Sequence, residues 1–163
     1  QRFVRSADLT AVGGAVAAVF AQTNLAELEL EATGYYALPW QNLGLAGITA
    51  APTRPLLALQ QSLIEAVAPF SEANGGPTAF VGAPETPTIG PTAAYVAAFV
   101  PDRTGANYNP HVTVGMAHED FVKRLLAEPF EPFVFSPVRA AIYQLGDLGT
   151  AQKELWSSIG DPR

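Results

Sequence analysis

The order of helical and strand patterns along this chain constrains its fold more than any other feature. Toward the C-terminus the patterns run strand, helix, strand, strand, and the segments are 111–116, 119–127, 133–135 and 138–145. The N-terminal part runs helix, strand, strand, with its helix over 9–20 and strands at Glu27–Glu31 and Tyr35–Leu38. The N-terminal order of elements therefore matches the C-terminal order, except that it lacks the leading strand. The repetition therefore predicts a strand upstream of Gln1.

The middle of the chain adds a strand at Leu45–Ala50 and a long helix. Thr53 is the expected cap of this helix, Pro55 lies in its first turn and Pro69 follows its end. Glycine and proline are concentrated in residues 71–92, which predicts a long surface loop that is functional or mobile. A short helix is expected from Thr92 to Val100, closed by Pro101. Residues 149–159 fit either a helix or a returning strand.

Apolar spacing predicts which side chains these elements bury. The expected inner faces are Leu9, Val12, Val16, Val19 and Phe20 in the first helix, Leu56, Leu59, Leu63 and Val67 in the second, and Phe121, Leu125 and Leu126 in the last. Strand alternation likewise predicts that Val112 and Val114 point into the core. With these faces, 163 residues are enough for a single domain with a core of its own.

Charge and composition exclude several classes of function. Acidic residues outnumber Lys and Arg by 15 to 9, so we expect no binding to long duplex nucleic acid, while a small anionic ligand or an RNA end remains possible. No apolar run is long enough to span a membrane, so we expect a soluble protein, cytoplasmic or exported. The chain has no cysteine and thus no thiol chemistry, and the row Glu27, Glu29 and Glu31 is a solvated strand face that does not converge on a metal.

Histidine is the side chain best suited to proton transfer at neutral pH, and His111 begins a predicted strand in the segment NYNPHVTVG. Residues two apart on a strand share a face, so His111 and Thr113 project together. An imidazole that exchanges a proton and a hydroxyl that binds a phosphate oxygen suit phosphoryl chemistry without a metal. The same pair also arises by chance as a structural contact, so alone it is a weak signal.

Longer segments resemble the two-histidine (2H) phosphoesterases, the superfamily of 2′-5′ RNA ligase-like proteins and cyclic phosphodiesterases. NPHVTVG followed by FEPFVFSPVRAAIYQLGDLGTAQKEL is similar to the C-terminal half of that family. GLAGITAAPTRPLLALQQSLIEAVAPF resembles the strand and helix before the second His-x-Thr signature, and QRFVRSADL the stretch after the first signature. The resemblance covers nearly the whole chain.

The resemblance implies an α+β fold of two pseudo-symmetric lobes, with antiparallel sheets lining a central cleft and helices outside. It implies hydrolysis or reversible formation of phosphodiester bonds at 2′,3′-cyclic or 2′-5′ RNA ends or nucleotides, without cofactor or metal. His111 and Thr113 form the second signature, and one histidine of each signature acts as base or acid. The expected substrate-binding residues are Arg2 and Arg5 near the first signature, Asn109 at the strand start, and Tyr143 and Gln144 on a neighbouring strand.

The first signature is absent from this sequence. His118 is followed by Glu119 and Asp120, so it supplies no second pair, and we expect it to be a solvated residue at a helix start. Either the first motif lies upstream of Gln1, and the protein is an enzyme, or the site is a half-site. A half-site indicates a non-catalytic module that binds a phosphate or nucleotide. A structural or interaction role is the third possibility, and in each case we expect a monomer.

Overall fold

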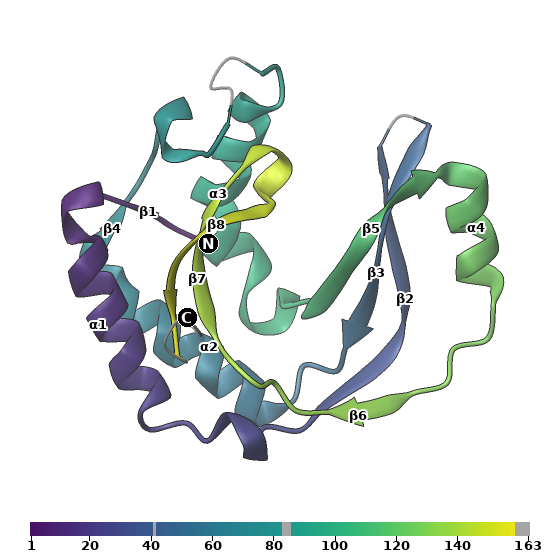
Figure 1. Ribbon diagram of the computed structural model, residues 1–163, viewed down its shortest axis with the longest axis horizontal. Helices are drawn as coiled ribbons and strands as arrows, with labels where there is room; N and C mark the ends of the chain where they lie inside the picture. The colour runs from purple at the N-terminus through teal and green to yellow at the C-terminus, as the bar shows by residue number, and fades with distance from the viewer. Residues whose placement is uncertain (41, 83–85, 159–163) are drawn as a thin grey trace, which may run out of the picture.

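The protein has an α+β fold in which four α-helices accompany antiparallel sheets, within the residues that the computed structural model describes, 1–40, 42–82 and 86–158. The helices are α1 (Leu9–Phe20), α2 (Arg54–Val67), α3 (Ile89–Arg103) and α4 (Glu119–Ala127). The strands are β1 (Phe3–Val4), β2 (Leu30–Trp40), β3 (Leu43–Ala50), β4 (Ser71–Glu72), β5 (His111–His118), β6 (Phe133–Phe135), β7 (Ala141–Leu145) and β8 (Ala151–Ser157). Figure 1 shows their arrangement.

The largest sheet has four antiparallel strands in the order β5-β3-β2-β6, which makes β5 an edge strand. Strand β2 is one continuous strand where the sequence predicts two, at Glu27–Glu31 and Tyr35–Leu38, and it pairs with β3 from Ala32 to Trp40. Thr33 is an extra residue in this pairing, because Ala32 lies opposite Ala50 and Gly34 lies opposite Thr49. Such a β-bulge bends and twists the strand.

Helix α4 covers one face of this sheet. A Cβ on Gly44 would lie 3.1 Å from the nearest Val122 methyl, so the helix approaches β3 closely at that residue. Only Val122 of α4 is buried, and the predicted inner residues Phe121 and Leu126 are 53% and 45% exposed, which corrects that part of the prediction. A helix of 9 residues makes only about two and a half turns, so few of its side chains face the sheet.

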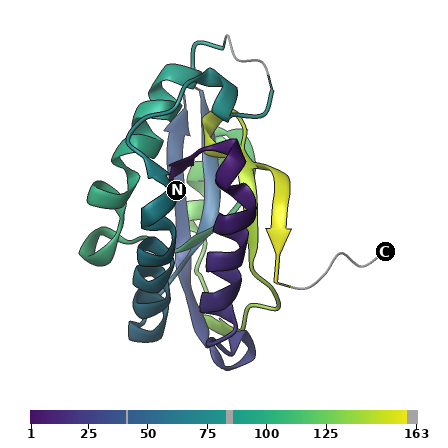
Figure 2. The same ribbon diagram turned by 90° about the vertical axis from the view of Figure 1, so that its left-hand side faces the viewer.

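Helices α1 and α2 lie side by side next to the second sheet, the hairpin β7–β8 (Figure 2). Helix α1 has the predicted bounds and buries Val12, Gly13 and Val16. The Trp156 ring of β8 stacks on Phe20 at 6.1 Å between centroids and also lies against Gly13. The C-terminal segment therefore returns as a strand, while residue 159, its predicted end, lies outside the described residues.

The main buried cluster consists of Phe3, Phe80, Ile89 and Val96. Phe3 and Phe80 meet edge to face with centroids 6.0 Å apart. Phe80 and Ile89 belong to residues 71–92, so the prediction of a surface loop there is wrong at these positions. Strand β4 pairs with β1, a 3-10 turn forms at Pro77–Ala79, and α3 begins at Ile89. Residues 83–85 of the predicted loop lie outside the described part.

Further element boundaries differ from the predicted ones, and β7 begins at Ala141 and not at the predicted Val138. Helix α3 runs on past Pro101, and the Thr104 hydroxyl closes its end by donating to the Val100 carbonyl at 2.7 Å. Residues Leu25–Glu27 form a 3-10 turn in place of the start of a strand, because the Asn24 side chain accepts a hydrogen bond from the Ala26 amide at 3.2 Å. Strand β2 accordingly begins only at Leu30.

None of the helices among the described residues combines the length and the apolar character that crossing a bilayer requires.

Candidate functional site

Strand β5 begins at His111 because the residue before it is a buried proline whose carbonyl still belongs to the sheet. The Pro110 carbonyl accepts a hydrogen bond from the Ala50 amide at 2.8 Å. The next pair in the ladder is Thr49 with His111, and Gly47 lies opposite Thr113. This register fixes where the imidazole and the hydroxyl leave the sheet.

His111 and Thr113 lie on one face of the sheet and contact the same side chain, Tyr36 of β2. The Tyr36 and His111 rings meet edge to face, with centroids 4.9 Å apart and planes at 64°. The Tyr36 hydroxyl lies 3.4 Å from the Thr113 hydroxyl. We call this surface, formed by Tyr36, Gly47, Thr49, His111 and Thr113, the His111 face.

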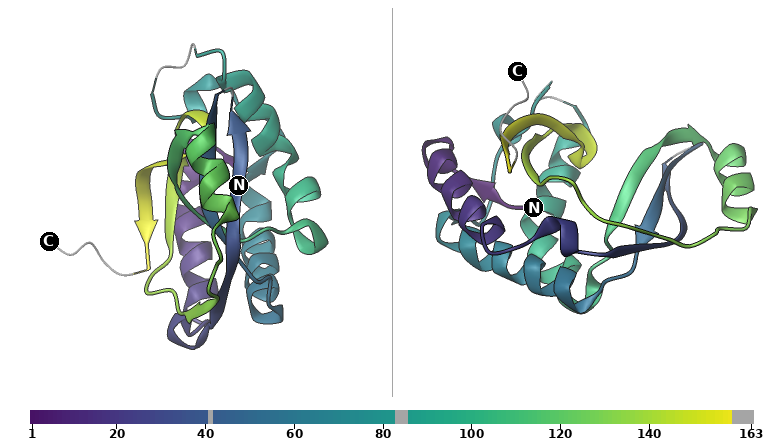
Figure 3. Two further views of the ribbon diagram at one scale, coloured as in Figure 1. Left: turned by 90° about the vertical axis from the view of Figure 1, so that its right-hand side faces the viewer. Right: turned by 60° about the horizontal axis from the view of Figure 1, so that its bottom comes forward.

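The His111 face is opposite the face that α4 covers. Gly44, which contacts Val122 of α4, lies three residues from Gly47 along β3 and so points to the other side of the sheet. Figures 1 and 3 show α4 on the side of the sheet away from β7 and β8. The His111 face is thus turned toward the β7–β8 hairpin, and both His111 and Thr113 are exposed.

The prediction that Val112 and Val114 point into the core is wrong. Their side chains are 52% and 69% exposed. Strand β5 is an edge strand, and α4 covers the sheet at Gly44, far from Val112. Val114 is also a bulge residue, because Thr113 pairs with Gly47 and Gly115 pairs with Ala46.

A backbone carbonyl fixes the tautomer of His111. The His111 Nδ1 atom lies 2.7 Å from the Asn109 carbonyl oxygen. A carbonyl oxygen only accepts hydrogen bonds, so Nδ1 carries the proton in the neutral ring and Nε2 keeps its lone pair. Nε2 is therefore able to accept a proton from a ligand or a water. Asn109, predicted to bind substrate, serves His111 through its main chain.

Tyr36 and Gly47 are the site residues that sequence reasoning missed. A Cβ at position 47 would lie 2.8 Å from Tyr36 Cζ and 2.6 Å from the Val112 carbonyl oxygen, distances that real Cβ atoms do not show. Glycine at this position lets the tyrosine ring cross β3 and reach β5. The only sequence signal is a glycine inside a strand pattern, which marks a close approach.

Thr49 adds a further hydroxyl beside His111. Its Oγ1 donates to the Gly34 carbonyl at 3.1 Å and lies 3.2 Å from the Thr33 hydroxyl. With its proton engaged at Gly34, Thr49 offers a ligand only its oxygen lone pairs.

Arg2 and Arg5, the two arginines predicted to bind substrate, lie in the N-terminal segment around β1. Arg5 Nε donates to the Asp8 carboxylate at 2.7 Å and lies 3.5 Å from Glu72. The hydrogen bond to Asp8, together with the charges of both carboxylates, raises the pKa of Arg5. Two carboxylates thus occupy this guanidinium, whereas Arg2 is an exposed residue just before β1.

The prediction that Tyr143 and Gln144 lie on a strand neighbouring His111 is wrong, because β7 pairs with β8 in a separate sheet and not with β5. The Tyr143 hydroxyl donates to Glu154 at 2.9 Å, and Arg139 donates to the same carboxylate oxygen at 3.0 Å. The hydrogen bond to Glu154 is the main reason that the pKa of Tyr143 is raised. Gln144 donates to the Ala79 carbonyl at 3.1 Å.

Tyr108 precedes β5, and burial raises the pKa of its hydroxyl.

His118 has the role expected from the sequence. It is the N-cap of α4, where Nδ1 accepts a hydrogen bond from the Asp120 amide at 3.3 Å, and its side chain is 57% exposed. His118 ends β5, about 20 Å from His111 by the rise of a strand. The two histidines therefore do not share a site.

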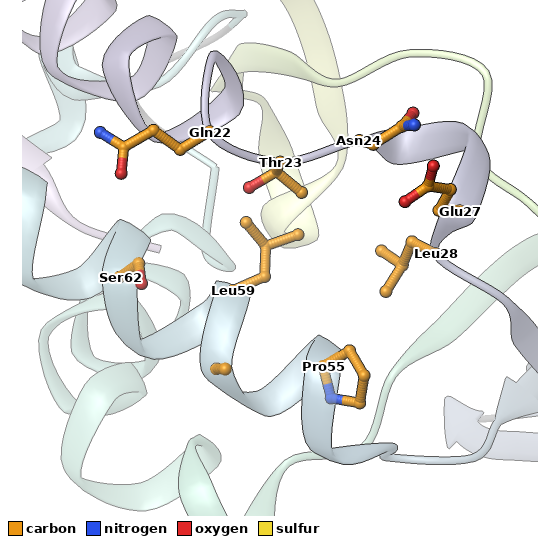
Figure 4. Close-up of a pocket in the computed structure, with 9 residues that line it drawn as sticks. Gln22, Thr23, Asn24, Glu27, Leu28, Pro55, Leu59 and Ser62 are labelled. Atoms are coloured by element: carbon orange, nitrogen blue, oxygen red, sulfur yellow. The ribbon is translucent and has the colours of Figure 1, made fainter.

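A pocket of about 320 Å³ lies elsewhere, between the end of α1 and the start of α2 (Figure 4). Leu28, Leu59 and Pro55 line it with apolar atoms, and Gln22 and Glu27 are among its polar residues. A second pocket of about 460 Å³ shares Gln22, Thr23 and Ser62 with it. Both pockets lie along the two helices and neither includes a residue of the His111 face.

Comparison with known proteins found no matching family model, no matching curated protein and no matching solved structure. The resemblance to 2H phosphoesterases stays a prediction.

Proposed function

We propose that the His111 face is one half of a 2H-type phosphoester site, which acts without a metal on 2′,3′-cyclic or 2′-5′ phosphodiesters of nucleotides or RNA ends. The observation that carries the proposal is the pairing of His111 with Thr113 on one exposed face, with Nε2 free to accept a proton. In the two-lobed arrangement we propose, the four-stranded sheet with α4 is one lobe. The β7–β8 hairpin with α1 and α2 belongs to the other (Figure 1).

The chemistry follows from these two groups. In hydrolysis of a cyclic phosphodiester, water attacks phosphorus, His111 Nε2 takes a proton from the water, and one ester P–O bond breaks. The Thr113 hydroxyl donates a hydrogen bond to a non-bridging phosphate oxygen. The leaving oxygen needs a proton, and in-line attack places it on the far side of phosphorus from the water. A second acid is therefore required for turnover.

An exposed apolar row beside the pair favours a nucleotide as the ligand. Leu38 pairs with Leu45, which pairs with Met116, so the three side chains share the His111 face. Leu38 and Met116 are 56% and 45% exposed. The row lies two residues along β3 from Gly47, about 7 Å from Thr113 by strand rise. This separation is comparable with that between phosphate and base in a nucleotide.

A non-catalytic phosphate-binding module is the second candidate. It is favoured by the distance between the two histidines, because the His111 face of the described chain carries a single imidazole. One imidazole contacts only one side of an in-line displacement, so such a site binds a phosphate group without turnover.

One set of assays separates these functions. We expect the protein to bind adenosine 2′-monophosphate in calorimetry, and His111→Ala and Thr113→Val to weaken binding while His118→Ala leaves it unchanged. Hydrolysis of adenosine 2′,3′-cyclic phosphate that His111→Ala abolishes supports the enzyme. Binding without hydrolysis supports the module.

Two results would oppose the proposal. If His111→Ala costs little activity or affinity, His111 is not the reacting group. If the protein binds no phosphorylated nucleotide, the structural or interaction role is left.

A further inference from the structure

Tyr36 contacts both of the proposed reacting groups, His111 through its ring and Thr113 through its hydroxyl. It lies on β2, two strands away from β5, and reaches His111 and Thr113 by crossing β3 at Gly47. A strand-centre glycine is unfavourable for the sheet in general, because it adds backbone entropy and no packing. At position 47 the missing side chain leaves room for the Tyr36 ring to lie over β3.

The direction of the hydrogen bond between Tyr36 and Thr113 follows from what a bound phosphate needs. Phosphate oxygens accept hydrogen bonds, so Thr113 must donate its single proton to the ligand. The Thr113 oxygen then has lone pairs left, and the Tyr36 hydroxyl at 3.4 Å is the group placed to donate to them. Donation by the phenol leaves the threonine proton for the phosphate, and the two bonds polarise each other.

The ring of Tyr36 acts on His111 in a different way. Its edge-to-face contact at 4.9 Å restricts rotation of the imidazole. Rotation would carry Nδ1 away from the Asn109 carbonyl, 2.7 Å distant, and would release the tautomer that leaves Nε2 unprotonated.

We infer that Tyr36 is a positioning residue of this site: its hydroxyl commits the Thr113 proton to the ligand, and its ring holds His111 with Nε2 outward. The inference rests on the proposed function for the ligand, but the effect on His111 is a property of the free protein. The two parts are tested separately.

The ring is tested without ligand by nitrogen-detected NMR of the neutral histidines, with His111 assigned through His111→Gln. We expect the wild-type protein and Tyr36→Phe to show the Nδ1–H tautomer of His111. We expect Tyr36→Ala to show a mixture of tautomers. Tyr35→Ala is the matched control, since Tyr35 is the adjacent tyrosine and contacts Phe130 on the other face. An unchanged tautomer in Tyr36→Ala overturns the role of the ring.

The hydroxyl is tested by a double-mutant cycle of Tyr36→Phe and Thr113→Val, with adenosine 2′-monophosphate as the calorimetric probe. We expect Tyr36→Phe to weaken binding roughly three- to tenfold, the worth of a neutral hydrogen bond. In the Thr113→Val background the same change should have no effect, because the bond that transmits it is gone. Additive losses, or no loss in Tyr36→Phe, overturn the role of the hydroxyl.

Failure of the proposed function gives a different result from failure of the inference about Tyr36. A wild-type protein that binds neither this nucleotide nor inorganic phosphate contradicts the phosphoester site and the hydroxyl's role. The tautomer measurement still decides whether Tyr36 positions His111.

Discussion

The ring of Tyr36 occupies the space where residue 47 would carry a side chain. Tyr36 and Gly47 are direct partners in the β2–β3 ladder, and Gly47 pairs on its other side with Thr113. The three residues form one row across the sheet, with the tyrosine lying over the glycine toward β5. The geometry of the His111 face therefore depends on a residue that contributes no side chain to it.

Gly47→Ala should disrupt this row. Its Cβ would meet the Tyr36 ring and lie 2.6 Å from the Val112 carbonyl, so both β2 and β5 must shift. We expect a loss of about 1–3 kcal/mol in the free energy of unfolding, as for other overpacked sites. We also expect weaker nucleotide binding, since Tyr36 leaves Thr113. Denaturant unfolding and calorimetry measure the two effects.

Gly14→Ala is the matched control for this prediction. Gly14 lies inside α1, and a Cβ there meets nothing within 4 Å. The same substitution should stabilise the protein by about 0.5–1 kcal/mol through backbone entropy. Equal effects of the two alanines would show that Gly47 has no special role.

Local signals were sufficient where an element is bounded by its own residues. Pro110 precedes β5, His118 caps α4, and both elements begin where the pattern predicts. Thr53 occupies the predicted N-cap position of α2 and Pro55 its first turn, but the buried Thr53 hydroxyl makes no capping hydrogen bond among the described residues. The other two boundaries each lie next to the ring that marks them in the sequence.

Local sequence signals do not predict cross-strand register or which face of a strand is buried. The position of Tyr36 opposite Gly47 and Thr113 depends on how three strands align, including bulges at Thr33 and Val114 that no local pattern marks. The exposure of Val112 depends on which strand forms the edge of the sheet. Alternation predicts which residues share a face but not which face is covered.

The hydrogen bond from Tyr143 to Glu154 predicts a late alkaline titration. This bond raises the pKa of Tyr143 above 10.0 because the neutral phenol donates to the carboxylate. A raised pKa stabilises the fold at pH below the unfolded value, and that contribution is lost as pH rises through the folded pKa. Phenolate absorbance, compared with that of Tyr143→Phe, should show this tyrosine ionising late.

Glu154→Gln tests the cause of that shift. Removal of the carboxylate charge should move the Tyr143 titration to lower pH. The titration of Tyr108 should not change, because burial raises its pKa. If Tyr143 titrates at the same pH in Glu154→Gln, the bond seen at 2.9 Å does not govern its ionisation.

Val122 should carry most of the contact between α4 and the sheet. It is 4% exposed and lies against Gly44, so Val122→Ala leaves space that a glycine opposite cannot fill. We expect a loss of about 2 kcal/mol in the free energy of unfolding. Val138→Ala removes the same atoms from a side chain that is 84% exposed and should stay within about 0.5 kcal/mol of wild type. Similar losses in both would contradict the packing of α4.

Strand β5 forms an edge of the four-stranded sheet among the residues that the structure describes, and this edge should make the protein associate when it is concentrated. Between His111 and His118 this strand carries no charged residue, and Val114 on it is 69% exposed. Unpaired backbone groups beside exposed apolar side chains are a template for strand pairing, which an edge lysine opposes. Val114→Lys should therefore reduce association in sedimentation velocity without a loss of stability.

Val138→Lys is the control that separates the effect of blocking the β5 edge from the effect of the added charge. Each lysine changes the net charge of −6 to about −5, which lowers electrostatic repulsion between molecules and by itself favours association. Val138 precedes β7 and lies outside the strands, so a lysine there blocks no edge. If Val114→Lys keeps the protein dispersed and Val138→Lys does not, β5 is the surface through which copies pair. If the two variants behave alike, association arises elsewhere.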